Sequence, residues 1–128
     1  MSAWRVPFLI GSIARLTYGV GAVLAPEWMA GRLAPSLRDH PDPRMNLRGF
    51  GGAQSAIALY TLATSTTPQR ARSLLALNAL VDGFDAAVSL LEGRARGRVD
   101  RIVAGGITVN LAGIACWTAA TITLRRST

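Results

Sequence analysis

The chain alternates between long apolar stretches and polar gaps that are rich in proline and arginine. Four apolar stretches cover about residues 6–24, 49–67, 73–91 and 102–124. The last holds 23 residues without a charge, and as a helix it spans about 35 Å, enough for the roughly 30 Å hydrocarbon core of a bilayer. The pattern predicts an all-α fold, a four-helix transmembrane bundle that forms one membrane domain over residues 1–128.

The gap at residues 26–48 is the only long connection between these stretches. Apolar residues recur there with helical spacing, at Trp28, Met29, Leu33 and Leu37. This spacing predicts a short helix on the membrane surface between spans 1 and 2. Pro41 and Pro43 follow, and they predict a rigid turn before the second span, because proline breaks a helix interior.

Composition supports the membrane interpretation. The chain is 50% hydrophobic and 16% charged, whereas a soluble domain carries about 25% charged residues. The net charge is +7, but the arginines lie in the gaps between apolar stretches, as membrane anchors do, and form no phosphate-binding stripe. We therefore expect a lipid bilayer as the surroundings and no nucleic acid as a partner.

The arginines also predict an orientation. With four spans, five arginines lie on the side of the termini: Arg5, Arg70, Arg72, Arg125 and Arg126. Eight lie on the other side: Arg32, Arg38, Arg44, Arg48, Arg94, Arg96, Arg98 and Arg101. Because cytoplasmic loops of membrane proteins are rich in arginine, we expect a multi-pass protein of the cytoplasmic (inner) membrane with both termini outside.

The third stretch carries a polar stripe. Asn78, Asp82, Asp85 and Ser89 are spaced i, i+4, i+7 and i+11, which places them on one helical face. Lipid cannot solvate such groups, so the stripe is expected to face the bundle interior.

Arg15 in the first stretch is the predicted partner of this stripe. Arg15 follows Val6 by the same offset as Asp82 follows Ser73, and the first and third spans run parallel, so the two side chains are predicted at equal depth. We expect the guanidinium to fork across Asp82 and Asp85. The other predicted members of this intramembrane network are Asn78, Gln54, Ser55 and Asn110.

Glycines flank these polar positions and predict close helix packing, because small residues let helices approach within a membrane. The predicted packing positions are Gly11, Gly19, Gly51, Gly52, Gly105 and Gly106.

No residue set indicates catalysis, a metal site or a cofactor. His40 is the only histidine and no serine lies near a His/Asp pair, so a Ser-His-Asp hydrolase is excluded. The predicted role is non-enzymatic: an accessory or structural subunit of a larger membrane assembly, with a membrane-protein partner or self-association. One arginine cannot neutralise two carboxylates, so one Asp could hold a proton. The alternative is therefore a small proton- or ion-coupled transporter that acts as a homo-oligomer.

The second stretch opens with Arg48-Gly-Phe-Gly-Gly-Ala-Gln. With Asp82 and Asp85, this opening resembles an uncharacterised family of small four-helix bacterial (actinobacterial-type) integral membrane proteins, a domain of unknown function. Its members begin the second helix with Arg-x-Phe-Gly-x-Arg. Arg48, Phe50 and Gly51 match that motif, and Ala53 stands in place of the second arginine. The resemblance implies a four-helix membrane fold and no particular activity.

Overall fold

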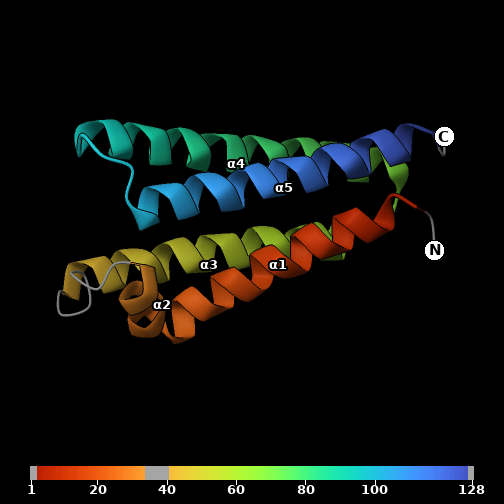
Figure 1. Cartoon of the computed structure of the whole chain (residues 1–128). Coiled ribbons are helices and arrows are strands. Elements are labelled where there is room, and N and C mark those ends of the chain that lie inside the picture. The colour runs from red at the N-terminus through yellow and green to blue at the C-terminus, as the bar shows by residue number, and fades with distance from the viewer. Residues whose placement is uncertain (1–2, 34–40, 127–128) are drawn as a thin grey trace.

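The computed structural model describes residues 3–33 and 41–126, and it folds them into five helices (Figure 1). They are α1 (Arg5–Leu24), α2 (Pro26–Leu33), α3 (Pro41–Thr64), α4 (Pro68–Ala95) and α5 (Arg101–Arg126). The prediction of an all-helical protein is confirmed, and the described residues contain no strand.

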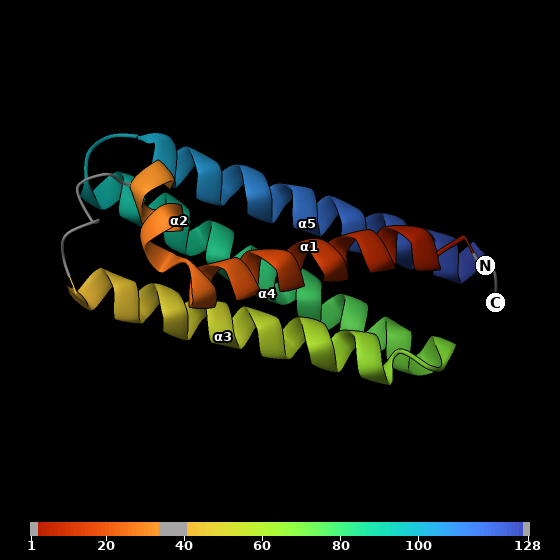
Figure 2. The same ribbon diagram turned by 90° about the horizontal axis from the view of Figure 1, so that it is seen from below.

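The four long helices run up and down, and both termini lie at one end of the bundle (Figure 1). α1 packs mainly on α3 and α4 mainly on α5, while the two pairs meet chiefly through α1 and α5. α3 and α4 contact each other much less. α2 is short and lies at the end away from the termini, where it contacts α1, α3 and α5 (Figure 2).

Three helices among the described residues are long and apolar enough to cross a membrane: α1, α4 and α5. The sequence pattern predicts four such helices, and the described residues contain three. α3 has 24 residues, but Arg48, Gln54 and several glycines lower its apolar character below that of the other three.

The second predicted span begins and ends too late. α3 starts at Pro41 and ends at Thr64, so the predicted turn at Pro41 and Pro43 is wrong. Proline is tolerated in the first helical turn, because the N–H groups of that turn have no intrahelical partner. α4 likewise begins at Pro68, before the predicted residue 73, since the Thr67 hydroxyl accepts the N–H of Arg70 and caps the helix.

The connection from α4 to α5 is a tight, hydrogen-bonded turn. Gly97 has φ = 64°, its N–H donates to the Arg94 carbonyl, and the Arg98 N–H donates to the Gly93 carbonyl. These two bonds form a Schellman cap, which favours glycine at the left-handed position.

The first turn of α5 is capped by Asp100. Its Oδ1 accepts the N–H groups of Ile102 (3.0 Å) and Val103 (3.1 Å), and its Oδ2 accepts from Arg96 at 3.1 Å. The pKa of this carboxyl lies below its ordinary value of 3.8, first because the Val103 N–H stabilises the charged form.

Replacing Asp100 by alanine is expected to lower the thermal stability at neutral pH. A carboxyl with a lowered pKa in the folded chain stabilises above pH 3.8, and this contribution disappears as the pH falls through the lowered value. The melting temperatures of wild type and Asp100→Ala should therefore differ at pH 7 and converge on acidification. Glu92→Ala is the control, because it also removes a partner of Arg96 but leaves the cap in place. A difference that persists in acid would contradict the capping role.

An aromatic cluster fills the core near the termini. Phe8 packs edge-on against Trp4 and Trp117, with ring centroids 5.6 and 6.4 Å away. Small and branched side chains close this cluster from α4 and α5, namely Ala71, Leu75, Ala120 and Leu124. Such edge-to-face contacts are favourable for aromatic rings, so this end of the bundle holds α1, α4 and α5 together.

Candidate functional site

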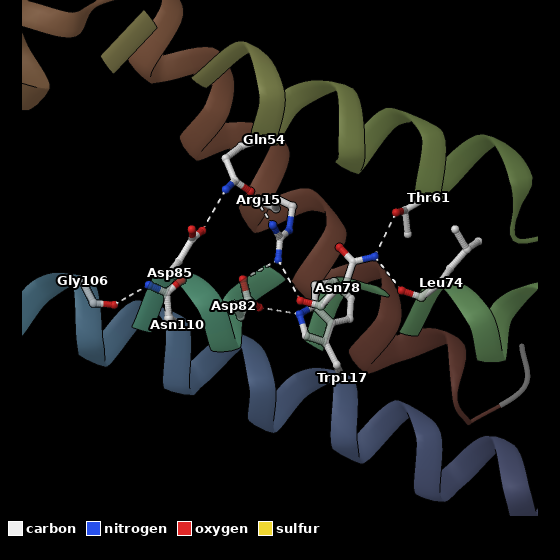
Figure 3. Close-up of polar contacts among 10 residues, drawn as sticks. All are labelled: Arg15, Gln54, Thr61, Leu74, Asn78, Asp82, Asp85, Gly106, Asn110 and Trp117. Carbon is white, nitrogen blue, oxygen red and sulfur yellow. Dashed lines mark hydrogen bonds and ion pairs between the residues drawn. The ribbon is translucent and has the colours of Figure 1, made fainter. Parts of the chain in front are cut away.

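Arg15 lies midway along α1 and joins three helices. Its side chain is buried between them. Nη2 donates to Oδ1 of Asp82 on α4, and Nη1 donates to Oε1 of Gln54 on α3 (Figure 3). Nη2 also lies 3.4 Å from the Asn78 carbonyl oxygen. The predicted pairing of Arg15 with Asp82 is present, so one guanidinium links α1 to both α3 and α4.

Both carboxylate oxygens of Asp82 are occupied. Oδ1 accepts from Arg15, and Oδ2 accepts from Nε1 of Trp117 on α5 at 2.6 Å (Figure 3). The Arg15 guanidinium also lies over the Trp117 ring, 5.8 Å from its centroid. A Cβ at Gly113 would collide with the Asp82 carboxylate, so this glycine leaves the space that the carboxylate fills.

Sequence reasoning did not assign Trp117 to the network. Its side chain is 1% exposed, and a buried indole N–H needs an acceptor. One feature of the sequence could have indicated this role. Trp117 lies inside an apolar stretch, away from the interface where tryptophans of membrane proteins gather.

Asp85 is not reached by Arg15 directly, so the predicted fork across both carboxylates is wrong. Nε2 of Gln54 instead donates to Oδ2 of Asp85 at 3.0 Å, while its Oε1 accepts from Arg15. Residues three apart point about 60° away from each other around a helix. Asp85 therefore turns away from Arg15, and Gln54 connects the two.

Asn78 makes a second link between α3 and α4. Its Nδ2 donates to Oγ1 of Thr61 on α3 at 3.0 Å and to the Leu74 carbonyl of its own helix at 2.8 Å. Thr61 and Asn78 are both buried. The contact lies deep between two helices that otherwise pack little, so it adds to their alignment.

The prediction that Asn110 belongs to the network is wrong. Its Nδ2 donates to the Gly106 carbonyl of its own helix at 2.8 Å. Ser89 behaves in the same way, because its hydroxyl donates to the Asp85 carbonyl at 2.9 Å. Short polar side chains can bond the backbone one turn earlier in a helix, and this gives each of these two donors an acceptor within its own helix.

Four of the predicted packing glycines lie at close helix contacts. A Cβ at Gly19 would lie 2.8 Å from the Gly51 carbonyl oxygen, and one at Gly51 would lie 2.6 Å from the Gly19 carbonyl oxygen. A Cβ at Gly11 would lie 2.5 Å from the Trp117 ring, and one at Gly106 would lie 2.5 Å from Ser89 Oγ. The backbones of α1 and α3 therefore meet beside the polar network.

The prediction that Gly52 and Gly105 also lie at close helix contacts is wrong. A Cβ at either position would have no atom of this chain, among the described residues, within 4 Å. Both lie next to a packed glycine, and adjacent helix positions point about 100° apart, so only one of each pair faces a neighbouring helix.

Replacing Trp117 by phenylalanine is expected to destabilise the bundle by about 1–3 kcal/mol, because Asp82 Oδ2 loses a buried donor while most of the ring volume remains. Thermal unfolding in detergent measures this. Phe8→Leu is the control, since it alters the same aromatic cluster without touching a hydrogen bond. The effect of Trp117→Phe should shrink in an Asp82→Leu background, which removes the acceptor, if the Nε1–H contact is its cause.

The described residues thus form a helical bundle with a paired ionic network inside and apolar side chains outside. Comparison with protein-family models, with curated proteins and with solved structures finds no match to this chain.

Proposed function

We propose that the chain is a small, non-enzymatic integral membrane protein, a structural or accessory subunit of a larger membrane assembly. Its four long helices cross the bilayer, and the network around Arg15 holds them in register. The observation that carries this proposal is the complete pairing of Asp82: one oxygen accepts from Arg15 and the other from Trp117. A carboxylate tied to two other helices is suited to fix helix register, which is the best-attested role of buried polar groups.

The outer surface of the bundle supports the bilayer as its surroundings. Large apolar side chains are more than half exposed on all four long helices, among them Ile10 (56%), Leu59 (55%), Phe84 (65%) and Val109 (60%). Continuous apolar exposure of this kind marks a surface for lipid or protein. Exposed charged side chains are instead gathered at the two ends.

The arginines support an orientation. The end at the termini carries five, and the opposite end carries eight, of which Arg38 lies outside the described residues. The arginine-rich end is on the cytoplasmic side of the inner membrane in this proposal, and both termini are outside. Trp28 of α2, with Arg32 stacked 4.3 Å from its ring centroid, fits the headgroup region at that end.

α3 crosses the membrane in this proposal although it is the least apolar of the long helices. It lies along α1 (Figure 1), and its polar groups Gln54 and Thr61 point inward to Arg15 and Asn78. Its outer face is open at Gly49 and Gly52. Small residues allow close approach of a second helix, which supports a membrane-protein partner or a second copy at α3.

Cysteine labelling in oriented vesicles tests the crossing of α3. In a Cys116→Ser background, Asn46→Cys and Thr66→Cys place single thiols at the two ends of α3. We expect a membrane-impermeant reagent to label Asn46→Cys only from the cytoplasmic side and Thr66→Cys only from outside. Labelling of both from one side would refute the four-span arrangement. Mass measurement of the assembly in mild detergent then separates a hetero-complex from copies of the 13.5 kDa chain.

A small proton- or ion-coupled transporter is the second candidate, and Asp85 favours it. The network holds one guanidinium for two carboxylates, and Asp85 is only partly buried with Gln54 as its side-chain donor. Asp85→Asn in proteoliposomes with a pH-sensitive dye inside tests it. If the wild type conducts protons and Asp85→Asn does not, at an unchanged melting temperature, transport is favoured. If the wild type shows no proton flux, the structural role is favoured.

A further inference from the structure

The α4–α5 hairpin contains a groove of about 400 Å³ beside its turn. This turn lies at the end of the bundle away from the termini (Figure 1). The wall of the groove is apolar, formed by Leu90 of α4, Val99 of the turn, and Val103 and Ile107 of α5. Arg94 and Arg98 also line it. The groove therefore joins two cationic groups to an apolar surface.

These two arginines lack an acidic partner within the described residues, whereas the arginine between them has two. Arg96 pairs with Glu92 and with Asp100, so both carboxylates beside the turn are engaged by one side chain. Arg94 and Arg98 are exposed, and the positive charge on the groove is not compensated from the hairpin itself. An anion is the complementary ligand, and guanidinium groups suit phosphate oxygens because they donate two parallel hydrogen bonds.

The apolar wall identifies the rest of the ligand. Leu90 and Val99 are 55% and 70% exposed, while Val103 is buried below them. A Cβ at Gly93 would lie 2.9 Å from Val103 Cγ1, so the absence of a side chain there lets α5 come close enough to form the floor. A free phosphate ion would occupy the arginines alone. A phospholipid would also cover Leu90 and Val99 with its acyl chains.

We infer that this groove binds a phospholipid with an anionic headgroup from the arginine-rich side of the membrane. Arg94 and Arg98 hold the headgroup, and Leu90, Val99 and Ile107 contact the acyl chains. The site lies where α4 ends and α5 begins, which is the depth of the headgroups in the proposed bilayer placement. The inference rests on that placement.

Native mass spectrometry of the full chain in mild detergent tests the site. The chain is titrated with phosphatidylglycerol and with phosphatidylcholine that carries the same acyl chains. We expect the wild type to bind one phosphatidylglycerol with clear preference. An arginine near an anionic headgroup contributes about fivefold in affinity, so Arg94→Gln with Arg98→Gln should lower phosphatidylglycerol affinity by about 25-fold. Phosphatidylcholine binding should not change.

The matched control is Arg32→Gln with Arg48→Gln. It removes two exposed arginines from the same end of the bundle, and neither lines the groove. We expect this variant to keep the preference for phosphatidylglycerol. An equal loss in both variants would overturn the inference in favour of diffuse charge attraction, and no loss in the groove variant would overturn it directly. Displacement of the lipid by inorganic phosphate would show a free-anion site instead.

The same samples separate this inference from the proposed function. Recovery of the wild type from the aqueous fraction without detergent would refute the membrane placement and, with it, the lipid site. A chain that requires detergent but binds both lipids equally would refute the lipid site alone.

Discussion

Replacing Arg15 by methionine is expected to destabilise the folded chain by about 3–5 kcal/mol, because it leaves the Asp82 carboxylate buried without its cation. Methionine keeps the apolar length of the side chain, so the loss reports mainly the missing guanidinium. Asp82 would retain only the Trp117 Nε1–H contact. Thermal unfolding of the purified protein in detergent, together with its level in the membrane, measures the effect.

A second substitution tests the cause. Adding Asp82→Asn to Arg15→Met removes the stranded charge and still presents an oxygen to Trp117. We expect this double variant to recover most of the lost stability, as replacement of a whole buried pair is often nearly neutral. Wild-type stability of Arg15→Met alone would refute the ion pair as the element that holds α1 to α4.

Replacing Gly51 by alanine is expected to destabilise the bundle by about 1–3 kcal/mol, the range for an overpacked core. The added Cβ would lie 2.6 Å from the Gly19 carbonyl oxygen and 2.7 Å from Ala22 Cβ on α1. One of these atoms belongs to the backbone, so α1 and α3 must separate. That separation would also move Gln54 on α3 away from Arg15. The melting temperature in detergent measures the loss.

The neighbouring glycine supplies the control for this variant. A Cβ at Gly52 would meet no atom of the described chain within 4 Å, and alanine favours a helix over glycine by up to about 1 kcal/mol. Gly52→Ala should therefore be neutral or stabilising in the isolated chain. Equal melting temperatures for the two variants would rule out the α1–α3 contact as the cause. Loss of self-association in Gly52→Ala would instead place a second copy at α3.

The apolar pattern predicted the helices better than their ends. Apolar stretches mark where a helix can be buried in an apolar medium, and each of the four predicted stretches overlaps one long helix of the structure. Helix ends depend on capping, which a hydropathy pattern does not report. Thr67 with Pro68 extends α4 toward its N-terminus, and α3 starts at Pro41, because proline is tolerated in a first turn.

The polar network was predictable only in part. Equal offsets along two parallel helices were enough to predict that Arg15 pairs with Asp82. Offsets along a chain give depth, but they do not give the direction of each side chain around its helix relative to a neighbour. For this reason Asp85 was assigned to Arg15, although Gln54 lies between them, and Asn110 was assigned to a network that it does not join.

The amino-acid pattern was sufficient to predict that the chain is helical, that α1 carries a buried arginine, and that α4 presents one polar face. Those features follow from periodicity and from the free energy of placing charge in an apolar medium, and both are properties of single helices. Only the packing of the helices shows that Trp117 donates to the second oxygen of Asp82 and that Gly51, rather than Gly52, meets α1. Such choices depend on the rotation and separation of neighbouring helices, which arise only when all side chains pack together.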